Sequence, residues 1–310
     1  MRRILAVVCL VATLVATSPA AAAPRYSDWT AGAFLSAVNT PELEFANAIS
    51  KNGLSFYFQR GNAAISGEDI WVVQRAATDA PWQTPQKLPA SINSTSNDRA
   101  AFESPDGHWL FFASDRPGGR GGFDLMVAWR PQTHAGPPDF GWQEAVNLDS
   151  LGSTINTPGF DSGPTAFEDE SGRLQLYLVS NPAGPQNLSV DIYQAIQNAN
   201  GSFGSPALVG ELSSAFNEGR PYVRHDGLEI YFNSNRPPGS TVQADLWVSI
   251  RATTTDPWSA PQIVRVVSTT ATEITPVLSW DASTLFFASN RTGSGGEIFF
   301  STREKLTGKP

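Results

Sequence analysis

The stretch SPDGHWLFFASDRPGGRGGFDLMVAWR, residues 104–130, decides the fold because both of its halves recur along the chain. Its first half is a turn followed by an aromatic strand, and this pattern returns as NGLSFYFQR, SGRLQLYLVSN, DGLEIYFNSNR and DASTLFFASNR. Its second half is a turn, an acidic residue and a strand, and it returns as GEDIWVVQR, VDIYQAI, ADLWVSIR and GEIFFSTR. The chain therefore contains five copies of one unit, and a repeat of about 50 residues is typical of propellers and other arrays.

A third element follows four of the copies, as WQTPQKL, WQEAVNL, FGSPALV and WSAPQIV. The last copy lacks it, but WTAGAFL, which begins at Trp29 near the other end of the chain, matches it. Each unit thus supplies four short strands in an up-and-down meander. Five such sheets bury their faces and protect their edges when they close into a ring.

We therefore predict an all-β protein that forms a single five-bladed β-propeller of four-stranded antiparallel blades over residues 23–310. We place the blades at about residues 44–88, 98–148, 161–209, 218–264 and 273–303. A strand within residues 29–38 completes the fifth blade and fastens the ring by hydrogen bonds.

The N-terminal residues 1–22 have the layout of a secretory signal peptide: two arginines, an apolar run and then small residues. Cys9, the single cysteine, lies inside the apolar run, so the mature chain has no disulfide. Acidic side chains outnumber basic ones, 29 to 21, which argues against a nucleic-acid partner. No second apolar run is long enough to span a membrane. We expect an exported monomer, either periplasmic or secreted.

The stretch SPDGHWLFFASDR followed by GGFDLMVAW resembles the TolB-type, WD40-like propeller repeat, whose pattern is S-P-D-G-x-x-L-F-F-x-S-x-R and then G-G-x-D-[IL]-x-V. The W-x-x-P and I-N-[ST] elements are similar to those of exported or envelope proteins that carry this repeat. The resemblance covers nearly all of the mature chain. It implies the propeller fold, and for function it implies a range that includes protein-binding scaffolds, sugar-associated modules and occasional enzymes.

Four arginines end second strands on the same face of the disc where acidic residues begin the third strands. We expect each arginine to form an ion pair within its own hairpin, worth about 0.2 to 1 kcal/mol. The expected pairs are Arg60–Asp69, Arg116–Asp124, Arg236–Asp245 and Arg291–Glu297. The third copy has Asn181-Pro182 in place of the arginine, so its acid, Asp191, needs another partner.

Five acidic residues precede the five first strands at one equivalent position: Glu44, Asp98, Asp161, Glu218 and Glu273. Asn or Ser stands five residues earlier in every copy: Asn39, Asn93, Asn156, Ser213 and Ser268. First strands line the channel of a propeller, so these acids are candidates for a binding site around its mouth. The alternative is that each accepts backbone hydrogen bonds from its own connection. Convergent acids need charge relief from Arg99 and Arg220, from a cation such as Ca²⁺, or from raised pKa values.

The search for catalytic groups finds no G-x-S-x-G elbow, and the three histidines have no metal-binding spacing. The leading hypothesis is an exported, non-catalytic module that binds an envelope protein or a glycan through its loops and acidic channel mouth, with no cofactor beyond a Ca²⁺ at that mouth. The alternative is a carbohydrate-active hydrolase or lyase that uses carboxylates there. We expect Trp29, Trp82, Trp142 and Trp258 to pack between blades rather than stack on sugars.

Overall fold

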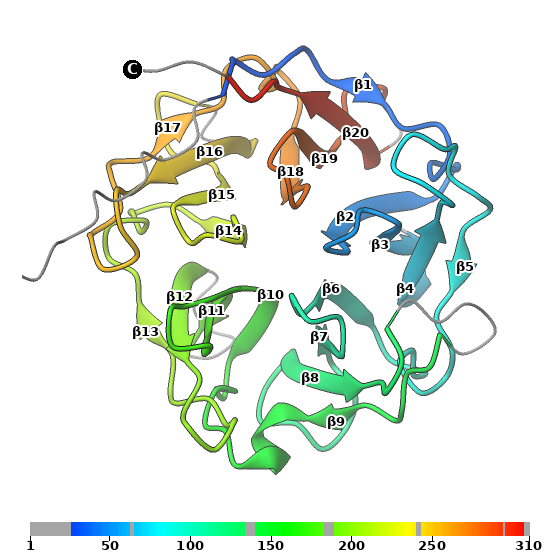
Figure 1. The fold of residues 1–310 in the computed structure, drawn as a ribbon, viewed down its shortest axis with the longest axis vertical. Helices are drawn as coiled ribbons and strands as arrows, with labels where there is room; N and C mark the ends of the chain where they lie inside the picture. The colour runs from blue at the N-terminus through cyan, green and yellow to red at the C-terminus, as the bar shows by residue number, and fades with distance from the viewer. Residues whose placement is uncertain are drawn as a thin grey trace, which may run out of the picture.

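The computed structural model describes residues 26–62, 65–133, 140–182, 189–239, 243–293 and 295–306. Its strands form five antiparallel sheets of four strands each, arranged in a ring, so the predicted five-bladed β-propeller is confirmed (Figure 1). The expected signal peptide, residues 1–22, lies outside the described residues. Among the residues described, no helix is long and apolar enough to cross a membrane.

The strands follow one another through the blades in chain order. Blade one contains β2 (Leu43–Ile49), β3 (Ser55–Asn62), β4 (Ile65–Gln74) and β5 (Gln86–Lys87). Blade two contains β6 (Asp98–Glu103), β7 (Trp109–Ser114), β8 (Asp124–Trp129) and β9 (Val146–Asn147). Blade three contains β10 (Phe160–Glu168), β11 (Leu174–Asn181), β12 (Asp191–Ile196) and β13 (Ala207–Leu208). Blade four contains β14 (Glu218–Val223), β15 (Glu229–Ser234), β16 (Asp245–Ile250) and β17 (Gln262–Ile263). Blade five contains β18 (Glu273–Leu278), β19 (Thr284–Ser289), β20 (Glu297–Thr302) and β1 (Ala33–Phe34).

The ring closes through β1, the N-terminal strand, as predicted. Ala33 pairs with Phe300 and Phe34 with Phe299, both of β20, so strands from opposite ends of the chain lie side by side (Figure 1). A further bridge joins Tyr26 to Lys305. Hydrogen bonds therefore close the ring with no disulfide.

The "LFF" strands are continuously apolar because both faces of each sheet are buried between neighbouring blades. On β7, Leu110 and Phe112 pack in a cluster with Tyr57 of blade one. Phe111, on the opposite face, packs in a cluster with Leu176 of blade three. Since side chains alternate along a strand, one strand contributes to two inter-blade cores.

Every first strand contains a break in its pairing register that bends it beside the axis. In blades two to five the residue two positions after the acid has a positive φ: 58° at Ala100, 62° at Gly163, 47° at Arg220 and 53° at Thr275. Three of these four residues are not glycine, so the bend is held against a local backbone cost of about 1 to 3 kcal/mol each. The bulge changes the direction of the side chains that follow the acid.

The five-residue spacing of Asn or Ser before each acid has a structural cause. The amide of Asn93 accepts from the Ile70 N–H at 2.8 Å and donates to the carbonyls of Ile70 and Leu88, both at 2.9 Å. Its side chain thus bonds to the third and fourth strands of the preceding blade. Asn39 makes the same two bonds with Ile298, whereas Ser213 donates once, to Val209 O at 3.1 Å.

Replacement of this asparagine should therefore cost more than replacement of the serine. We expect Asn93→Ala to lower the free energy of unfolding by about 2 kcal/mol or more, because it leaves buried backbone groups of Ile70 and Leu88 without partners. Ser213→Ala should cost about 0.5 to 1.5 kcal/mol. Urea unfolding measures both; equal losses in the two variants would contradict this role of the asparagine.

Candidate functional site

The five acids that the sequence singles out occupy equivalent places at the start of the first strands, and all are fully buried. Glu44, Asp98, Asp161, Glu218 and Glu273 each have 0% exposed surface. Their burial favours the alternative drawn from the sequence, in which each acid accepts hydrogen bonds from its own connection, over a binding ring at the channel mouth.

Each acid is held by a Thr or Ser four residues earlier, in the connection that leads into its own blade. For example, Ser94 donates to Asp98 from its backbone N–H at 2.6 Å and from its hydroxyl at 2.8 Å. The same pair of bonds is present in every blade, from Thr40, Ser94, Thr157, Ser214 and Thr269. Each carboxylate thus closes a loop of its own connection.

Four of the acids also bind an arginine, and this corrects the predicted hairpin ion pairs. The observed pairs, with N–O distances, are Arg60–Glu44 (2.9 Å), Arg116–Asp98 (2.7 Å), Arg236–Glu218 (2.7 Å) and Arg291–Glu273 (3.0 Å). The third-strand acids have other contacts: Asp69 binds Lys87 at 2.7 Å, and Asp124 accepts from the Arg120 N–H at 2.6 Å. The arginine stabilises the fold most when it pairs with the buried first-strand acid, because a buried carboxylate without a counter-ion costs the most free energy.

The same arginines connect the blade to the chain entering it from the preceding blade. Arg116 Nη2 donates to Ile92 O at 2.6 Å, and Arg291 Nη2 donates to Val267 O at 2.8 Å. Arg60 and Arg236 make the equivalent bonds to Val38 and Leu212. We call this set of contacts the acid joint. It consists of the acid, the Thr or Ser four residues earlier and, in four of the blades, the arginine, and it lies where each blade meets the connection that enters it.

Arg99 and Arg220 do not relieve the acids, contrary to expectation. Arg220 Nη2 of blade four donates to Gln59 Oε1 of blade one at 2.9 Å, a contact that crosses the axis. Arg99 Nη1 binds Glu68 Oε2 at 3.2 Å, and Gln59 Nε2 donates to Glu68 Oε1 at 3.2 Å. Burial and repulsion from Arg99 lower the pKa of Arg220 to about 9. We call these four residues, Gln59, Glu68, Arg99 and Arg220, the axial network.

A small space lies where the first strands of the blades end. Side chains from all five blades, among them Ile49, Glu103, Ala166, Tyr222 and Leu278, surround a space of about 20 Å³. That volume holds about one water molecule. The described part of the chain contains no group of three or more His, Cys, Asp or Glu side chains arranged to bind a metal.

A second set of arginines, which the sequence analysis did not single out, ends the third strands. Each lies over the ring of the tryptophan that precedes the fourth strand of its blade and donates through Nε to the turn that joins the first two strands. The arginine–tryptophan pairs are Arg75–Trp82, Arg130–Trp142, Arg251–Trp258 and Arg303–Trp29, with 4.1 to 4.4 Å from guanidinium to ring centre. The acceptors are the carbonyls of Gly53, Gly107, Gly227 and Ala282. Trp142 and Trp258 are buried, and Trp29 and Trp82 are half-buried against a core cluster.

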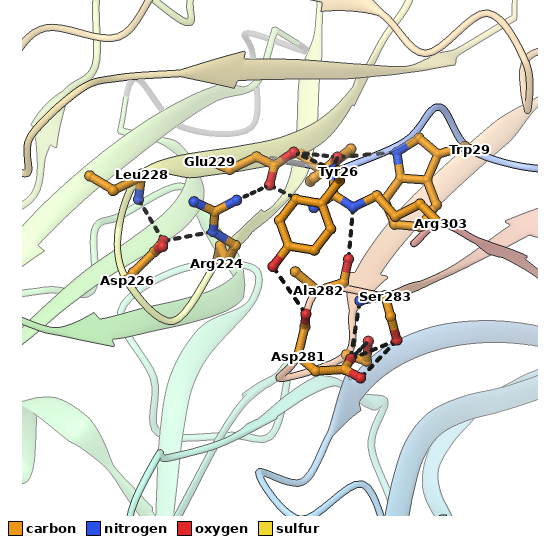
Figure 2. Close-up of polar contacts among 12 residues, drawn as sticks. Tyr26, Trp29, Arg224, Asp226, Leu228, Glu229, Asp281, Ala282, Ser283 and Arg303 are labelled. Carbon is orange, nitrogen blue, oxygen red and sulfur yellow. Dashed lines mark hydrogen bonds and ion pairs between the residues drawn. The ribbon is translucent and has the colours of Figure 1, made fainter. Parts of the chain in front are cut away.

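At two blade boundaries this arginine joins a tyrosine and a buried glutamate. Between blades one and two, Glu103 Oε2 accepts from Tyr57 at 2.6 Å and from Arg130 at 2.9 Å. Between blades four and five, Glu229 accepts from Tyr231 at 2.6 Å and from both Nη atoms of Arg303 at 2.8 and 2.9 Å. Figure 2 shows Glu229 between Arg224 and Arg303. Contact with these arginines outweighs burial and lowers the pKa of Glu229.

Blade three departs from both arginine patterns. Pro182 stands at the position of the acid-binding arginine, and Gln197 stands where the other blades have their third-strand arginine. Ser180 donates to Asp161 Oδ1 at 2.6 Å, as Ser234 and Ser289 donate to the acids of blades four and five beside their arginines. Burial, the largest effect, raises the pKa of Asp161. A hollow of about 660 Å³ lies beside this blade, lined on one side by Gln175 and Gln194 and on the other by Arg251 and Trp258 of blade four.

The sequence contains signals for the residues that were missed. A Thr or Ser precedes every acid by four residues, and an arginine precedes the W-x-x-P element in most units. The Thr or Ser position is as regular as the acid position, whereas the arginine is replaced by Gln197 in the third unit. The glutamates Glu103 and Glu229 have no such signal, because they stand at different positions in their blades and meet the same kind of partners only through the packing of neighbours.

Comparisons with known proteins show the fold alone. No protein-family model and no curated protein matches the chain. A thermostable family-43 glycoside hydrolase has a similar structure, with a TM-score of 0.55 and 12% identity over 86% of this chain and 91% of that one. An α-L-arabinofuranosidase from Podospora anserina has a TM-score of 0.53 and 12% identity over 91% of this chain and 98% of that one.

TolB from Acinetobacter baumannii is also similar, with a TM-score of 0.44 and 14% identity over 86% of this chain and 56% of that one. A likeness of that strength carries no argument about family. Folds of this kind serve unrelated functions, so function rests on the residues of the site.

The acid joint of blade three predicts an unusual response to pH. Burial raises the pKa of Asp161 in the folded protein above its value of about 3.9 in the unfolded chain. The free energy of folding that comes from protonated Asp161 is therefore fully present below pH ~3.9, and it is lost as the pH rises through the pKa of the folded state. Asp161→Asn keeps an acceptor for Thr157 and gains a donor for Ser180. We expect this variant to be at least as stable as the wild type at pH 7 and to lose that advantage below about pH 4.

Asp98→Asn is the matched control, because Arg116 binds Asp98 and would lose its counter-ion. We expect Asp98→Asn to lower the free energy of unfolding by about 2 to 4 kcal/mol at pH 7. This figure is reduced for solvent screening, because the Arg116 side chain is 17% exposed. Thermal unfolding across pH 3.5 to 8 compares the two. An Asp161→Asn variant as unstable at pH 7 as Asp98→Asn would contradict the argument.

Proposed function

We propose that the protein is an exported propeller of the TolB type that binds an envelope protein or a glycan and performs no chemistry on it. The observation that carries the proposal is the state of the five acids, each of which is buried and bonded within its own blade. The N-terminal run of apolar residues supports export, and the acidic composition supports a partner other than nucleic acid.

A glycoside hydrolase needs two carboxyl groups about 5 to 9.5 Å apart, both facing the scissile bond. In this protein the acids at the channel mouth have no exposed surface, so they do not meet that need. Glu68, at the axis, is 27% exposed, but it binds both Arg99 and Gln59. The axial network joins Arg220 of blade four to Gln59 of blade one, and the space of about 20 Å³ at the ends of the first strands is too small for a sugar ring.

The similar structures include a glycoside hydrolase and an arabinofuranosidase, and these names favour carbohydrate among the candidate partners. The propeller supplies only the frame for such a site. Binding without turnover is therefore consistent both with the shared fold and with the internal use of the acids. The faces of the disc, where the connections between strands lie, are the surfaces on which we expect the partner.

A glycan panel tests the proposal directly. We expect the mature protein to bind one or more members on a glycan array, or a purified envelope protein by chemical cross-linking. We expect neither reducing sugar nor unsaturated product to be released from arabinan, arabinoxylan or uronate-containing polysaccharides. Glu68→Gln is the matched variant, because it removes the partly exposed axial carboxylate while preserving side-chain shape.

Turnover that is present in the wild type and lost in Glu68→Gln would establish the carbohydrate-active alternative instead. Absence of both binding and turnover across the panel and the envelope proteins would reject the binding role.

A further inference from the structure

The second residue after the acid of each first strand breaks the repeat in blade four. The other blades have a small residue at this position: Ala46, Ala100, Gly163 and Thr275. Blade four has Arg220 there. The positive φ of this position is shared by blades two to five, so the fold accounts for the backbone but not for a long cationic side chain.

Arg220 of β14 reaches across the centre of the ring. Its Nη2 donates to Gln59 Oε1 of β3 at 2.9 Å, and β14 faces blade one across the axis (Figure 1). Gly163 of blade three leaves room for this side chain, since a Cβ at residue 163 would lie 3.3 Å from Arg220 Cδ. The guanidinium therefore lies inside the ring, between strands of different blades.

The axial network carries one more positive charge than negative. Glu68 uses Oε2 to bind Arg99 and Oε1 to accept from Gln59, whereas the acceptor of Arg220 is the neutral amide of Gln59. Two guanidinium groups thus stand against one carboxylate. Burial and then repulsion from Arg99 lower the pKa of Arg220 to about 9, so the side chain still carries its charge at pH 7. An internal charge without a counter-ion is strongly destabilising.

Solvent reaches the axial network, although it lies inside the ring. The side chains of Arg99 and Glu68 are 19% and 27% exposed, and Arg220 is partly exposed. Arg220 bonds to the described residues through Nη2 alone. Its Nε and Nη1 donors are therefore available to a ligand that enters along the axis.

Other polar atoms at the same level of the first strands also lack partners. Within the described residues, Arg99 Nε, Ser162 Oγ, Thr275 Oγ1 and the amide oxygen of Asn47 are buried and make no hydrogen bond. Ser162 stands one residue after its acid, as Arg99 does, and Thr275 stands two after, as Arg220 does. Three of these four atoms can donate. Unpaired buried polar groups are rare in folded proteins, and a bound ion is one of the causes that account for them.

We propose that the axial network binds one small monovalent anion against Arg220, with Arg99 as the second positive group. A single negative charge balances the network, and the N–H groups of a guanidinium bind anions through charge-assisted hydrogen bonds. Glu68 repels a second negative charge, so sulfate and phosphate are disfavoured.

The bound anion ties blade four to blades one and two across the axis. A ligand that binds only the folded state stabilises that state, so the ion strengthens the closed ring. This inference goes beyond the proposed function, because the ion lies inside the ring whether or not a face of the disc binds a partner.

Thermal unfolding of the mature protein tests the site, with chloride as the probe. Sodium gluconate replaces sodium chloride at constant ionic strength, so the screening of surface charges does not change. We expect the melting temperature to rise by about 2 to 4 °C as chloride increases from about 3 mM to about 300 mM. Bromide and nitrate, which are also small and monovalent, should act as chloride does.

Two variants of the network and a surface control separate binding from general salt effects. Arg220→Met removes the charge that holds the ion, so its melting temperature should not depend on chloride. Glu68→Gln removes the opposing carboxylate, so the affinity for chloride should rise about threefold to tenfold. Arg265→Met removes the same charge as Arg220→Met at an exposed site and should keep the wild-type response.

Anomalous diffraction from crystals soaked in sodium bromide locates the ion. We expect a bromide peak within hydrogen-bond reach of Arg220 Nε or Nη1, and no such peak in crystals of Arg220→Met. Bromide bound only at the outer surface of the disc would overturn the proposal.

Equal melting temperatures of the wild type in chloride and gluconate would also reject the site. So would a chloride response that Arg220→Met retains, since the ion would then lie elsewhere. If Arg220→Met does not fold, Glu68→Gln and the bromide peak still decide, because an unchanged chloride affinity in Glu68→Gln contradicts the proposal. The glycan and envelope-protein assays are independent of these results, so failure of this site and failure of the larger binding role are distinguishable.

Discussion

A buried carboxylate at the start of each first strand is the interaction on which the ring depends. It accepts from the backbone and hydroxyl of a residue four positions earlier, and in four blades it also binds an arginine from the end of the second strand. That arginine in turn bonds to the connection arriving from the preceding blade. The acid joint therefore fixes the angle at which the chain leaves one blade and enters the next. A ring of five sheets closes only if that angle repeats.

The joints are costly to leave incomplete, because a buried charge without its partner is strongly destabilising. Because of this cost, the partners of the acid repeat around the ring together with the acid itself. The lone pairs of these acids are used by hydroxyl, backbone and guanidinium donors. Blade three, which has neither repeat arginine, is the exception, and Asp161 keeps only its hydroxyl and backbone donors, from Ser180 and Thr157. The hollow beside that blade is where the ring departs most from its own pattern.

Sequence reasoning located the acids but assigned them the wrong partners. The sequence suggested Arg99, Arg220 or a cation such as Ca²⁺ as charge relief for the acids and paired Arg116 with Asp124, whereas Arg116 binds Asp98. The direction of Arg99 is set by the bulge in β6, where Ala100 has a φ of 58°, and a bulge has no signature in a single sequence without glycine. Likewise Arg116 lies two residues beyond Ser114, which pairs with both Asp98 and Asp124, so strand order alone does not decide which acid it reaches.

The sequence by itself determined the number of blades, the order of their strands and the closure of the last blade by the N-terminal strand. These follow from short-range patterns, because each unit repeats its turns and its apolar strands and the missing fourth strand is present at the other end of the chain. Only the tertiary structure decided which charges are buried, which arginine meets which acid and at which two boundaries a glutamate is buried. Those contacts join residues far apart in the chain, such as Arg303 with Glu229 and Arg220 with Gln59. Their partners are chosen by burial and by side-chain direction, which a repeat pattern does not specify.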